Sequence, residues 1–320
     1  MHWLIKTTIW GFFLSSVGVA TAMVGCSSDP PAATSSSSSS GDDGSSGTSG
    51  TSGTSGTSGT SGTSGSSGTP EPDPDVKLST ESFMHNGAAR KYILALPVDY
   101  SDAKKYPLVM VFHGNPGTAE FMRDYLPFHK TSKRDAIVVY PNSAPDGDQD
   151  WDLSTPFDQN DDMTFTRELL GALKQKYSIA DGKIWASGWS GGAQFINQLS
   201  CRSNFLKAIA AHSGAQPLDV CATGTCNPGV CNKGPVALFA TNGENDGSES
   251  NPGAGRYAGE VWGQINKCGQ GQSDTAPAPC KKQNGCPAST PVFVCIIPGN
   301  GHGQWSEGDT NAWAFFNALP

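Results

Sequence analysis

A serine between glycines, at the point where an apolar strand gives way to a helix, constrains this chain more than any other feature. The stretch KIWASGWSGGAQF, residues 183–195, carries Gly-Trp-Ser-Gly-Gly at 188–192. A serine at a sharp, strained turn needs small neighbours on both sides, and such a turn exposes its hydroxyl above the end of a sheet. An ordinary glycine-rich turn is the alternative. The strand before it and the helix after it favour a nucleophile.

Apolar segments alternate with amphipathic ones over residues 76–320. The pattern predicts strands at 90–97, 107–114, 135–142, 205–214, 235–243 and 290–299, and helices at 161–177, 191–201, 255–268 and 310–319. Near-continuous apolar strands fit a sheet that is covered on both faces. Because strands alternate with helices, the sequence predicts one α/β domain over 76–320, with helices on both faces of a mostly parallel sheet.

The first 75 residues are of a different kind. Residues 1–25 place Lys6 before an apolar run, which is typical of a signal peptide. The run ends at MVGC, which resembles the lipobox of bacterial lipoproteins. That resemblance implies a lipid on Cys26, membrane attachment through it, and a secreted, cell-surface or outer-membrane lipoprotein of a bacterium. The alternative is a soluble secreted protein that is cut nearby.

Residues 26–75 form a predicted disordered linker rich in Ser, Gly and Thr, with six consecutive Thr-Ser-Gly triplets at 48–65. A segment with so few apolar residues cannot bury enough surface to offset the entropy that it would lose on ordering. A flexible coil of this length spans on the order of 40 Å. The linker therefore fits a tether that holds the domain away from a membrane.

Charge and cysteine content limit the partners and the compartment. Six of the 29 acidic residues and one of the 21 basic residues precede residue 76, so the domain is only slightly acidic and nucleic acid is not expected as a partner. Eight of the nine cysteines lie after residue 200, an even number behind a signal peptide, which indicates disulfides. Zinc is the alternative, but the sequence has no C-x2-C pair, and we expect no metal or cofactor.

Two disulfides are predicted from the places of the cysteines. Cys280 and Cys286 flank a polar KKQNG segment and are expected to close a local loop. Cys268 ends a predicted helix and Cys295 ends a predicted strand, and these two are expected to pair.

A serine nucleophile needs a base, and the base needs an orienting carboxylate. After a strand–serine–helix turn of this kind the partners follow in the order Ser, Asp, His. With Ser190 as the nucleophile, His302 in the loop after the last apolar strand is the predicted base, and Asp246 is the predicted acid, with Glu244 as the alternative. His113 precedes the serine, so we interpret it as a structural residue that shapes its loop.

Backbone N–H groups are predicted to bind the oxyanion. One is that of Gly191, directly after the serine, and the other is that of Asn115, in the loop after an early strand. Trp189 and Trp305 lie beside the predicted nucleophile and base in the sequence, and we expect them to line the substrate site.

Five motifs together resemble carbohydrate esterase family 1: VFHG, a DD pair before a helix, ASGWSGGAQF, NGEND and GNGHGQW. This family holds feruloyl esterases, acetylxylan esterases and polyhydroxybutyrate depolymerase-like proteins. The resemblance implies an α/β-hydrolase fold and a secreted serine esterase that uses Ser190, Asp246 and His302. Its expected substrate is an ester on a polysaccharide or oligosaccharide. The alternatives are a polyhydroxyalkanoate depolymerase, a serine peptidase and a non-catalytic surface-binding lipoprotein.

The lipid anchor can be tested directly. We expect Cys26→Ser to move the protein from the detergent phase to the aqueous phase on detergent-phase partitioning, because the thiol that would carry the lipid is gone. Wild-type protein found entirely in the aqueous phase would contradict the anchor.

Overall fold

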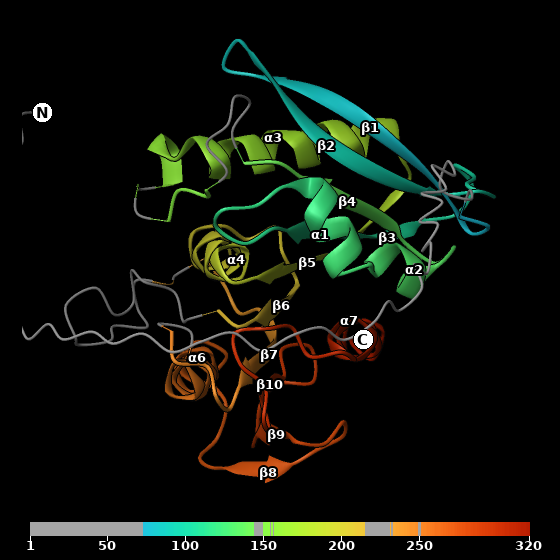
Figure 1. Ribbon diagram of the computed structural model, residues 1–320. Coiled ribbons are helices and arrows are strands. Elements are labelled where there is room, and N and C mark those ends of the chain that lie inside the picture. Colours follow the sequence, from blue (N-terminus) through green and yellow to red (C-terminus); the bar gives the residue numbers. More distant parts are fainter. Residues whose placement is uncertain are drawn as a thin grey trace, which may run out of the picture. The chain divides into compact units, whose positions relative to one another are not determined.

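A ten-stranded sheet runs through the chain and carries helices on both of its faces (Figure 1). The computed structural model describes residues 73–143, 150–153, 155, 157–214, 231, 233–248 and 251–320. All of them lie in one unit, Ser66–Pro320. The predicted signal peptide, Cys26 and nearly all of the predicted linker lie outside the described residues.

The strands stand in the order β1-β2-β4-β3-β5-β6-β7-β10-β9-β8. Their bounds are β1 Val76–His85, β2 Ala88–Pro97, β3 Tyr106–Phe112, β4 Ile137–Pro141, β5 Ile179–Trp189, β6 Ala208–His212, β7 Ala237–Gly243, β8 Gln272–Asp274, β9 Cys280–Gln283 and β10 Val292–Ile297. The central strands from β4 to β10 are parallel, whereas β1-β2, β2-β4, β9-β10 and β8-β9 pair antiparallel. The predicted, mostly parallel α/β sheet is therefore confirmed.

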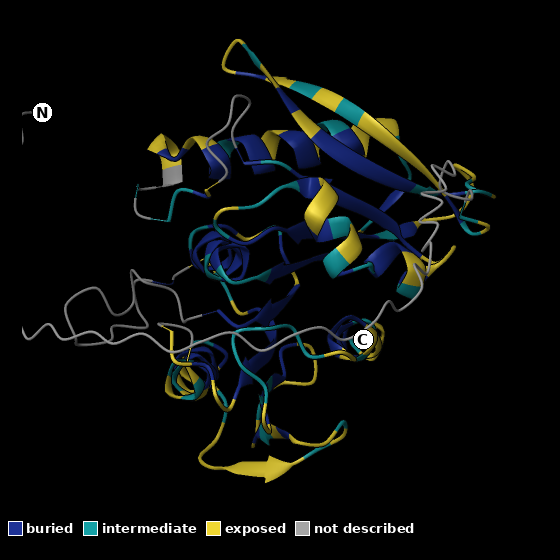
Figure 2. Cartoon of the chain, in the orientation of Figure 1, coloured by how far each residue is buried: buried dark blue, intermediate teal, exposed yellow. Residues whose placement is uncertain are grey.

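Each face of the sheet has its own hydrophobic core. In Figure 1, α3, α4 and α6 lie on one side of the sheet and α1, α2 and α7 on the other. The helices are α1 Ala119–Tyr125, α2 Phe128–Ser132, α3 Asp161–Lys176, α4 Gly191–Arg202, α6 Pro252–Ile265 and α7 Gly308–Asn317, with a short 3₁₀ helix, η1, at Phe157–Gln159. Because both faces are covered, strands such as β4 and β7 are buried at every position, which explains their continuous apolar sequences (Figure 2).

A buried ion pair fixes α3 to the antiparallel edge. Arg90 of β2 is only 1% exposed, and its guanidinium contacts the carboxylates of Asp161 and Asp162 at the start of α3. It also lies 4.0 Å from the centre of the Phe165 ring. Two acidic residues at a helix N-terminus fit the helix dipole, and here they also neutralise a charge that would be costly to bury alone.

Several elements lie outside the sequence prediction. β1 is an edge strand whose residues are mostly exposed and polar, so it lacks the apolar pattern by which the inner strands are recognised. β8 is exposed throughout (Figure 2). The helices α1 and α2 have seven and five residues, too few to establish a helical period.

Both predicted disulfides are wrong. Cys280 pairs with Cys295 and Cys268 pairs with Cys286. The KKQ segment after Cys280 is strand β9 and not a turn, and its antiparallel register with β10 places Cys280 opposite Cys295. Cys286 then lies where the chain passes the end of α6. A third disulfide joins Cys201 to Cys231, while Cys221 and Cys226 lie outside the described residues.

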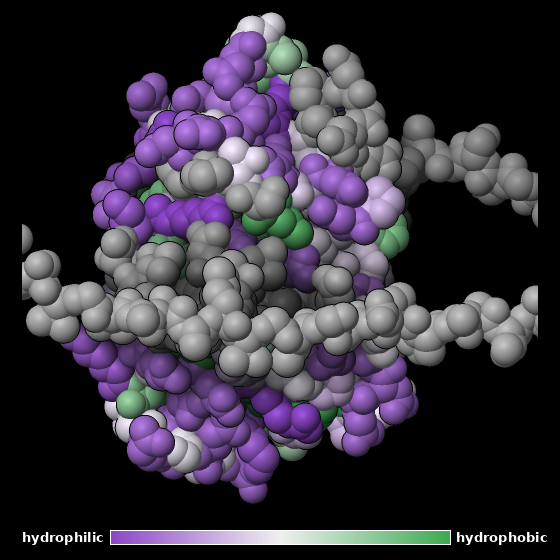
Figure 3. All heavy atoms as spheres, turned by 90° about the vertical axis from the view of Figure 1, so that its left-hand side faces the viewer, coloured by the Kyte–Doolittle hydropathy of each residue, from purple (hydrophilic) through white to green (hydrophobic). Residues whose placement is uncertain are grey.

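Where Figure 3 colours this side of the molecule, most residues are hydrophilic, with small hydrophobic patches between them. Among the described residues, no helix is both long enough and apolar enough to cross a membrane.

Three buried histidines make the stability depend on pH. Burial lowers the pKa of His113, His129 and His212 from 6.5 to about 4. Between these values the unfolded chain binds protons that the folded chain does not, so the free energy of unfolding falls as the pH is lowered.

We expect each of these histidines to contribute up to about 1.4 kcal/mol per pH unit to that slope. His129 is the test position because it is distant in sequence from the serine turn. Its replacement leaves the other two buried histidines in place. His129→Gln should therefore reduce the slope between pH 6 and pH 4.5, measured by denaturant unfolding with the disulfides intact. An unchanged slope would contradict the neutral, buried state of His129.

Candidate active site

Neighbouring parallel strands bring the predicted site residues to one edge of the sheet. β3, β5, β6, β7 and β10 are consecutive neighbours, and their carboxyl ends point the same way. The loop with Asn115 follows β3, Ser190 follows β5, Asp246 follows β7 and His302 follows β10. Residues that are far apart in the sequence therefore meet because each lies just beyond a strand end.

Ser190 lies in a strained turn between β5 and α4. Its φ of 53° is in the left-handed region that residues with a side chain rarely adopt. Gly188 and Gly192 make the turn possible. A Cβ at Gly192 would lie 2.3 Å from the carbonyl oxygen of His113, and one at Gly188 would lie 2.6 Å from the backbone of Gly192. The two glycines thus allow backbone to pack on backbone, as the sequence pattern predicts.

The hydroxyl of Ser190 and the imidazole of His302 are within hydrogen-bond distance. Ser190 Oγ lies 2.9 Å from His302 Nε2, and His302 Nδ1 lies 2.8 Å from Asp246 Oδ2. This is the serine–base–carboxylate arrangement that activates a hydroxyl as a nucleophile. The structure therefore brings the three predicted residues together, while their catalytic roles stay predictions.

Asp246 is held as a carboxylate by hydrogen bonds. It is 4% exposed, and this burial by itself raises its pKa. Hydrogen bonds from Ser248 and His302 act more strongly in the other direction, so that the pKa of Asp246 lies below its ordinary value. The Ser248 hydroxyl donates to Asp246 Oδ1 at 2.6 Å and also lies 3.1 Å from His302 Nδ1. Sequence reasoning missed Ser248, which is marked only by its place two residues after the acid.

Glu244 has a different task. It is exposed, and its carboxylate accepts a hydrogen bond from the backbone N–H of Gly299 at 3.1 Å. This contact joins the loop after β7 to the loop that carries His302. The geometry thus favours Asp246 as the partner of His302 and gives Glu244 a bracing contact.

Asn115 and Gly191, the predicted oxyanion donors, lie against each other. A Cβ at Gly191 would lie 2.4 Å from Cγ of Asn115. The side chain of Asn115 is bound to the backbone of Trp151, whose N–H donates to Asn115 Oδ1 at 3.0 Å. The Trp151 ring also donates through Nε1 to the carbonyl oxygen of His113 at 2.9 Å. Trp151, buried in the core, therefore fixes the loop from two sides, and sequence reasoning did not foresee this.

His113 is structural in its contacts. It is buried, its Nδ1 lies 2.8 Å from the carbonyl oxygen of Gly114, and its Nε2 accepts a hydrogen bond from the backbone N–H of Ser143. These contacts fit the prediction that His113 shapes the loop after β3.

Trp189 lies beside His302, and both Trp189 and Trp305 pack against the same core cluster. The Trp189 ring centre is 5.4 Å from that of His302, and its Nε1 donates to the His302 carbonyl oxygen at 3.1 Å. Trp305 is half-buried against the core cluster that contains α7. The position of Trp189 suits a substrate-lining role, and for Trp305 that role stays a prediction.

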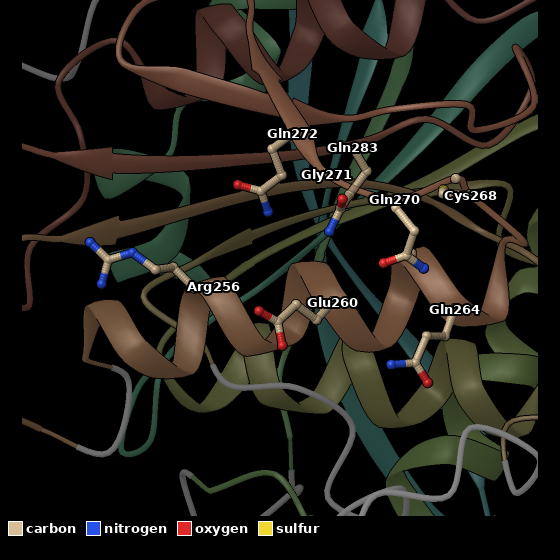
Figure 4. A pocket seen from close by; sticks show the side chains of 10 residues that line it. Arg256, Glu260, Gln264, Cys268, Gln270, Gly271, Gln272 and Gln283 are labelled. Carbon is tan, nitrogen blue, oxygen red and sulfur yellow. The ribbon is translucent and has the colours of Figure 1, made fainter.

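A separate polar pocket of about 430 Å³ lies along α6. In Figure 4, Arg256 and Glu260 extend from α6, and Gln272 and Gln283 face them from the neighbouring strands. None of the predicted site residues lines this pocket. No cluster of three or more His, Cys, Asp or Glu side chains suited to a metal ion occurs within the described ranges.

Sequence comparison connects the chain to esterases. It is 27% identical to feruloyl esterase B of Piromyces equi over 244 residues, which cover 71% of this chain and 44% of that protein. It is also 27% identical to feruloyl esterase D of Neurospora crassa over 260 residues, 72% of this chain and 83% of that protein. The chain is related to the feruloyl esterases. This confirms the resemblance seen in the motifs, although no protein-family model matches the chain.

Solved structures show the same fold. The acetyl xylan esterase from Aspergillus awamori superposes with a TM-score of 0.63 at 16% identity, covering 76% of this chain and all of that one (100%). A ferulic acid esterase from Anaeromyces mucronatus superposes with a TM-score of 0.51 at 17% identity, covering 79% and 95%. The predicted α/β-hydrolase fold is thereby confirmed. The chain spans less than half of the Piromyces equi relative, so the two proteins are comparable over this part only.

The choice of acid can be tested without a substrate. A fluorophosphonate probe reacts with an activated serine, and we expect it to label Ser190. Asp246→Asn should slow this labelling by roughly 10³–10⁴-fold, because the imidazole loses the carboxylate that orients it. Glu244→Gln is the matched control and should label within a few-fold of wild type, since an amide oxygen can still accept from Gly299. A larger loss in Glu244→Gln would reverse the assignment.

Proposed function

We propose that this protein is a serine esterase that hydrolyses carboxylic esters on polysaccharides or oligosaccharides. The observation that carries the proposal is the chain of contacts from Ser190 Oγ through His302 to Asp246, at 2.9 and 2.8 Å. The relationship to feruloyl esterases supports an ester as the substrate.

The first half of the reaction acylates the serine. His302 Nε2 takes the proton of Ser190 as Oγ attacks the ester carbonyl carbon. The carbonyl oxygen becomes an oxyanion, which the backbone N–H groups of Gly191 and Asn115 would bind. The imidazolium, stabilised by the Asp246 carboxylate, then gives its proton to the leaving alcohol oxygen as the C–O bond breaks. This leaves an acyl group on Ser190.

The second half repeats these steps with water. His302 takes a proton from a water molecule whose oxygen attacks the acyl carbon. Collapse of the second tetrahedral intermediate breaks the bond to Ser190 Oγ, which recovers its proton from His302. The products are the alcohol and the carboxylic acid, and no cofactor is required.

The proposed substrate is a feruloyl or acetyl ester on a carbohydrate. The matched relatives are feruloyl esterases, and one structural neighbour is an acetyl xylan esterase. Such a polymer is met outside the cell. The three disulfides described fit an oxidising, extracellular compartment.

We propose further that residues 76–320 form the catalytic domain of a bacterial lipoprotein, held to the membrane by a lipid on Cys26 and by the linker 26–75. The sequence MVGC and the Thr-Ser-Gly repeats support this part of the proposal. A long tether suits a polymeric substrate that cannot enter the cell, since the domain must extend from the membrane to contact that polymer.

A panel of esters tests both the mechanism and the substrate. We expect hydrolysis of methyl ferulate or acetylated xylan to exceed that of long-chain triglycerides. Ser190→Ala should lower turnover by roughly 10⁶-fold, since only residual stabilisation by the remaining groups is left.

Three outcomes would change the proposal. Activity of Ser190→Ala within tenfold of wild type would contradict the serine mechanism. Preference for long-chain triglycerides would contradict the substrate class. A preference for hydroxybutyrate oligomers would point to a polyhydroxyalkanoate depolymerase with the same three residues.

A further inference from the structure

Three aromatic rings contact one another between His302 and solvent. Phe121 and Tyr125 of α1 are stacked, with ring centres 5.1 Å apart. Tyr125 lies 4.9 Å from Trp189, which in turn lies 5.4 Å from the His302 ring. We call Phe121, Tyr125 and Trp189 the aromatic ledge.

The two inner rings of the ledge are fixed through their polar atoms. Tyr125 Oη accepts a hydrogen bond from the backbone N–H of Gln304 at 2.7 Å, and Trp189 Nε1 donates to the carbonyl oxygen of His302 at 3.1 Å. Both bonds are made to the loop that carries His302. The ledge and the imidazole are thus held in one arrangement before any ligand binds, which lowers the entropic cost of binding.

The ledge is exposed at Phe121, its outermost ring. Trp189 and Tyr125 are half-buried, whereas Phe121 is 48% exposed. Single exposed apolar residues are common on protein surfaces. Phe121 differs from a scattered residue because its ring stacks on Tyr125 and its centre lies 6.2 Å from that of Trp189, which borders His302. A ledge that is open at its far end suits a group that remains attached to a polymer.

The side of the site on which the ledge lies indicates which part of an ester it contacts. In the proposed reaction His302 Nε2 gives its proton to the leaving alcohol oxygen, so the alcohol part departs past His302. The predicted oxyanion donors, Gly191 and Asn115, lie together at the loop that Trp151 fixes. Trp189 borders both groups, since its ring lies against Gly114 and its centre is 5.4 Å from that of His302. The outer part of the ledge lies on the His302 side, because Tyr125 Oη accepts from the N–H of Gln304 in the loop that carries His302. This places the ledge on the alcohol side.

We propose that the aromatic ledge is the subsite for the sugar ring that forms the alcohol part of the ester, and that Phe121 determines specificity for carbohydrate esters over simple alkyl esters. This inference rests on the esterase function proposed above. The C–H face of a sugar can pack on the rings, and a contact worth 0.5–1.5 kcal/mol corresponds to roughly two- to tenfold in kcat/KM.

The kinetic test compares two esters that share an acyl group and differ in the alcohol: methyl ferulate and a feruloylated oligosaccharide. We expect Phe121→Ala to lower the ratio of kcat/KM, oligosaccharide over methyl ester, by about three- to tenfold. Phe121→Trp should restore the ratio because it retains a ring. Met84→Ala removes another exposed apolar side chain, 62% exposed on β1, and should leave both values unchanged.

Two kinetic outcomes would overturn the proposal. An equal loss on both esters would place the acyl group on the ledge. No loss on either would make Phe121 an ordinary surface residue.

A binding measurement separates failure of the ledge from failure of the esterase proposal. Unesterified xylo-oligosaccharide is titrated into the Ser190→Ala protein while tryptophan fluorescence is followed, with Trp189 as a reporter within the ledge. We expect saturable binding that Phe121→Ala weakens by about three- to tenfold. Binding that Phe121→Ala does not change would refute the ledge even if the esterase is active. If Phe121→Ala weakens binding but the protein with Ser190 intact hydrolyses no ester, the ledge is retained and the proposed reaction is refuted.

Discussion

The close contact between the start of α4 and the end of β3 is the constraint on which the rest of the site depends. Gly192 lies so near the carbonyl oxygens of Phe112 and His113 that a side chain at 192 would collide with them. This contact allows Ser190 to adopt its left-handed conformation, with a φ of 53°. It also sets the spacing between the serine and the loop of Asn115. Ser190 and the predicted oxyanion donors are therefore positioned by the same backbone contact.

Asp246 and His302, the predicted acid and base, are held to each other by backbone as well as by side chains. The N–H of Asn245 donates to the carbonyl oxygen of Asn300 at 2.8 Å, and a Cβ at Gly243 would lie 2.0 Å from the carbonyl oxygen of Gly301. The loops after β7 and β10 are thus joined next to Asp246 and His302. Because β7 and β10 are neighbouring parallel strands, this junction follows from the sheet order. A sheet of this kind supports a precise site with short loops.

The accuracy of the sequence prediction followed the strength of the local signal. The inner strands were predicted because a strand that is buried on both faces has a continuous apolar sequence. The long helices were predicted because a helix that is buried on one side has apolar residues at helical spacing. The edge strands β1 and β8, and β9 next to β8, carry polar residues and leave no such pattern. The disulfides were mispaired for the same reason. Because the KKQ segment of β9 was interpreted as a turn, its pairing with β10, which sets Cys280 opposite Cys295, could not be predicted.

The sequence by itself determined the turn at Ser190, the α/β class and the expected order of serine, carboxylate and histidine along the chain, because each rests on residues that are neighbours in the chain or on the direction of parallel strands. Tertiary structure alone decided which carboxylate faces the imidazole, since Asp246 and Glu244 are two residues apart and only the packing of two loops distinguishes them. The same holds for the aromatic ledge. Phe121 belongs to a helix too short to leave a signal, and it meets Trp189 only when α1 packs beside the end of β5.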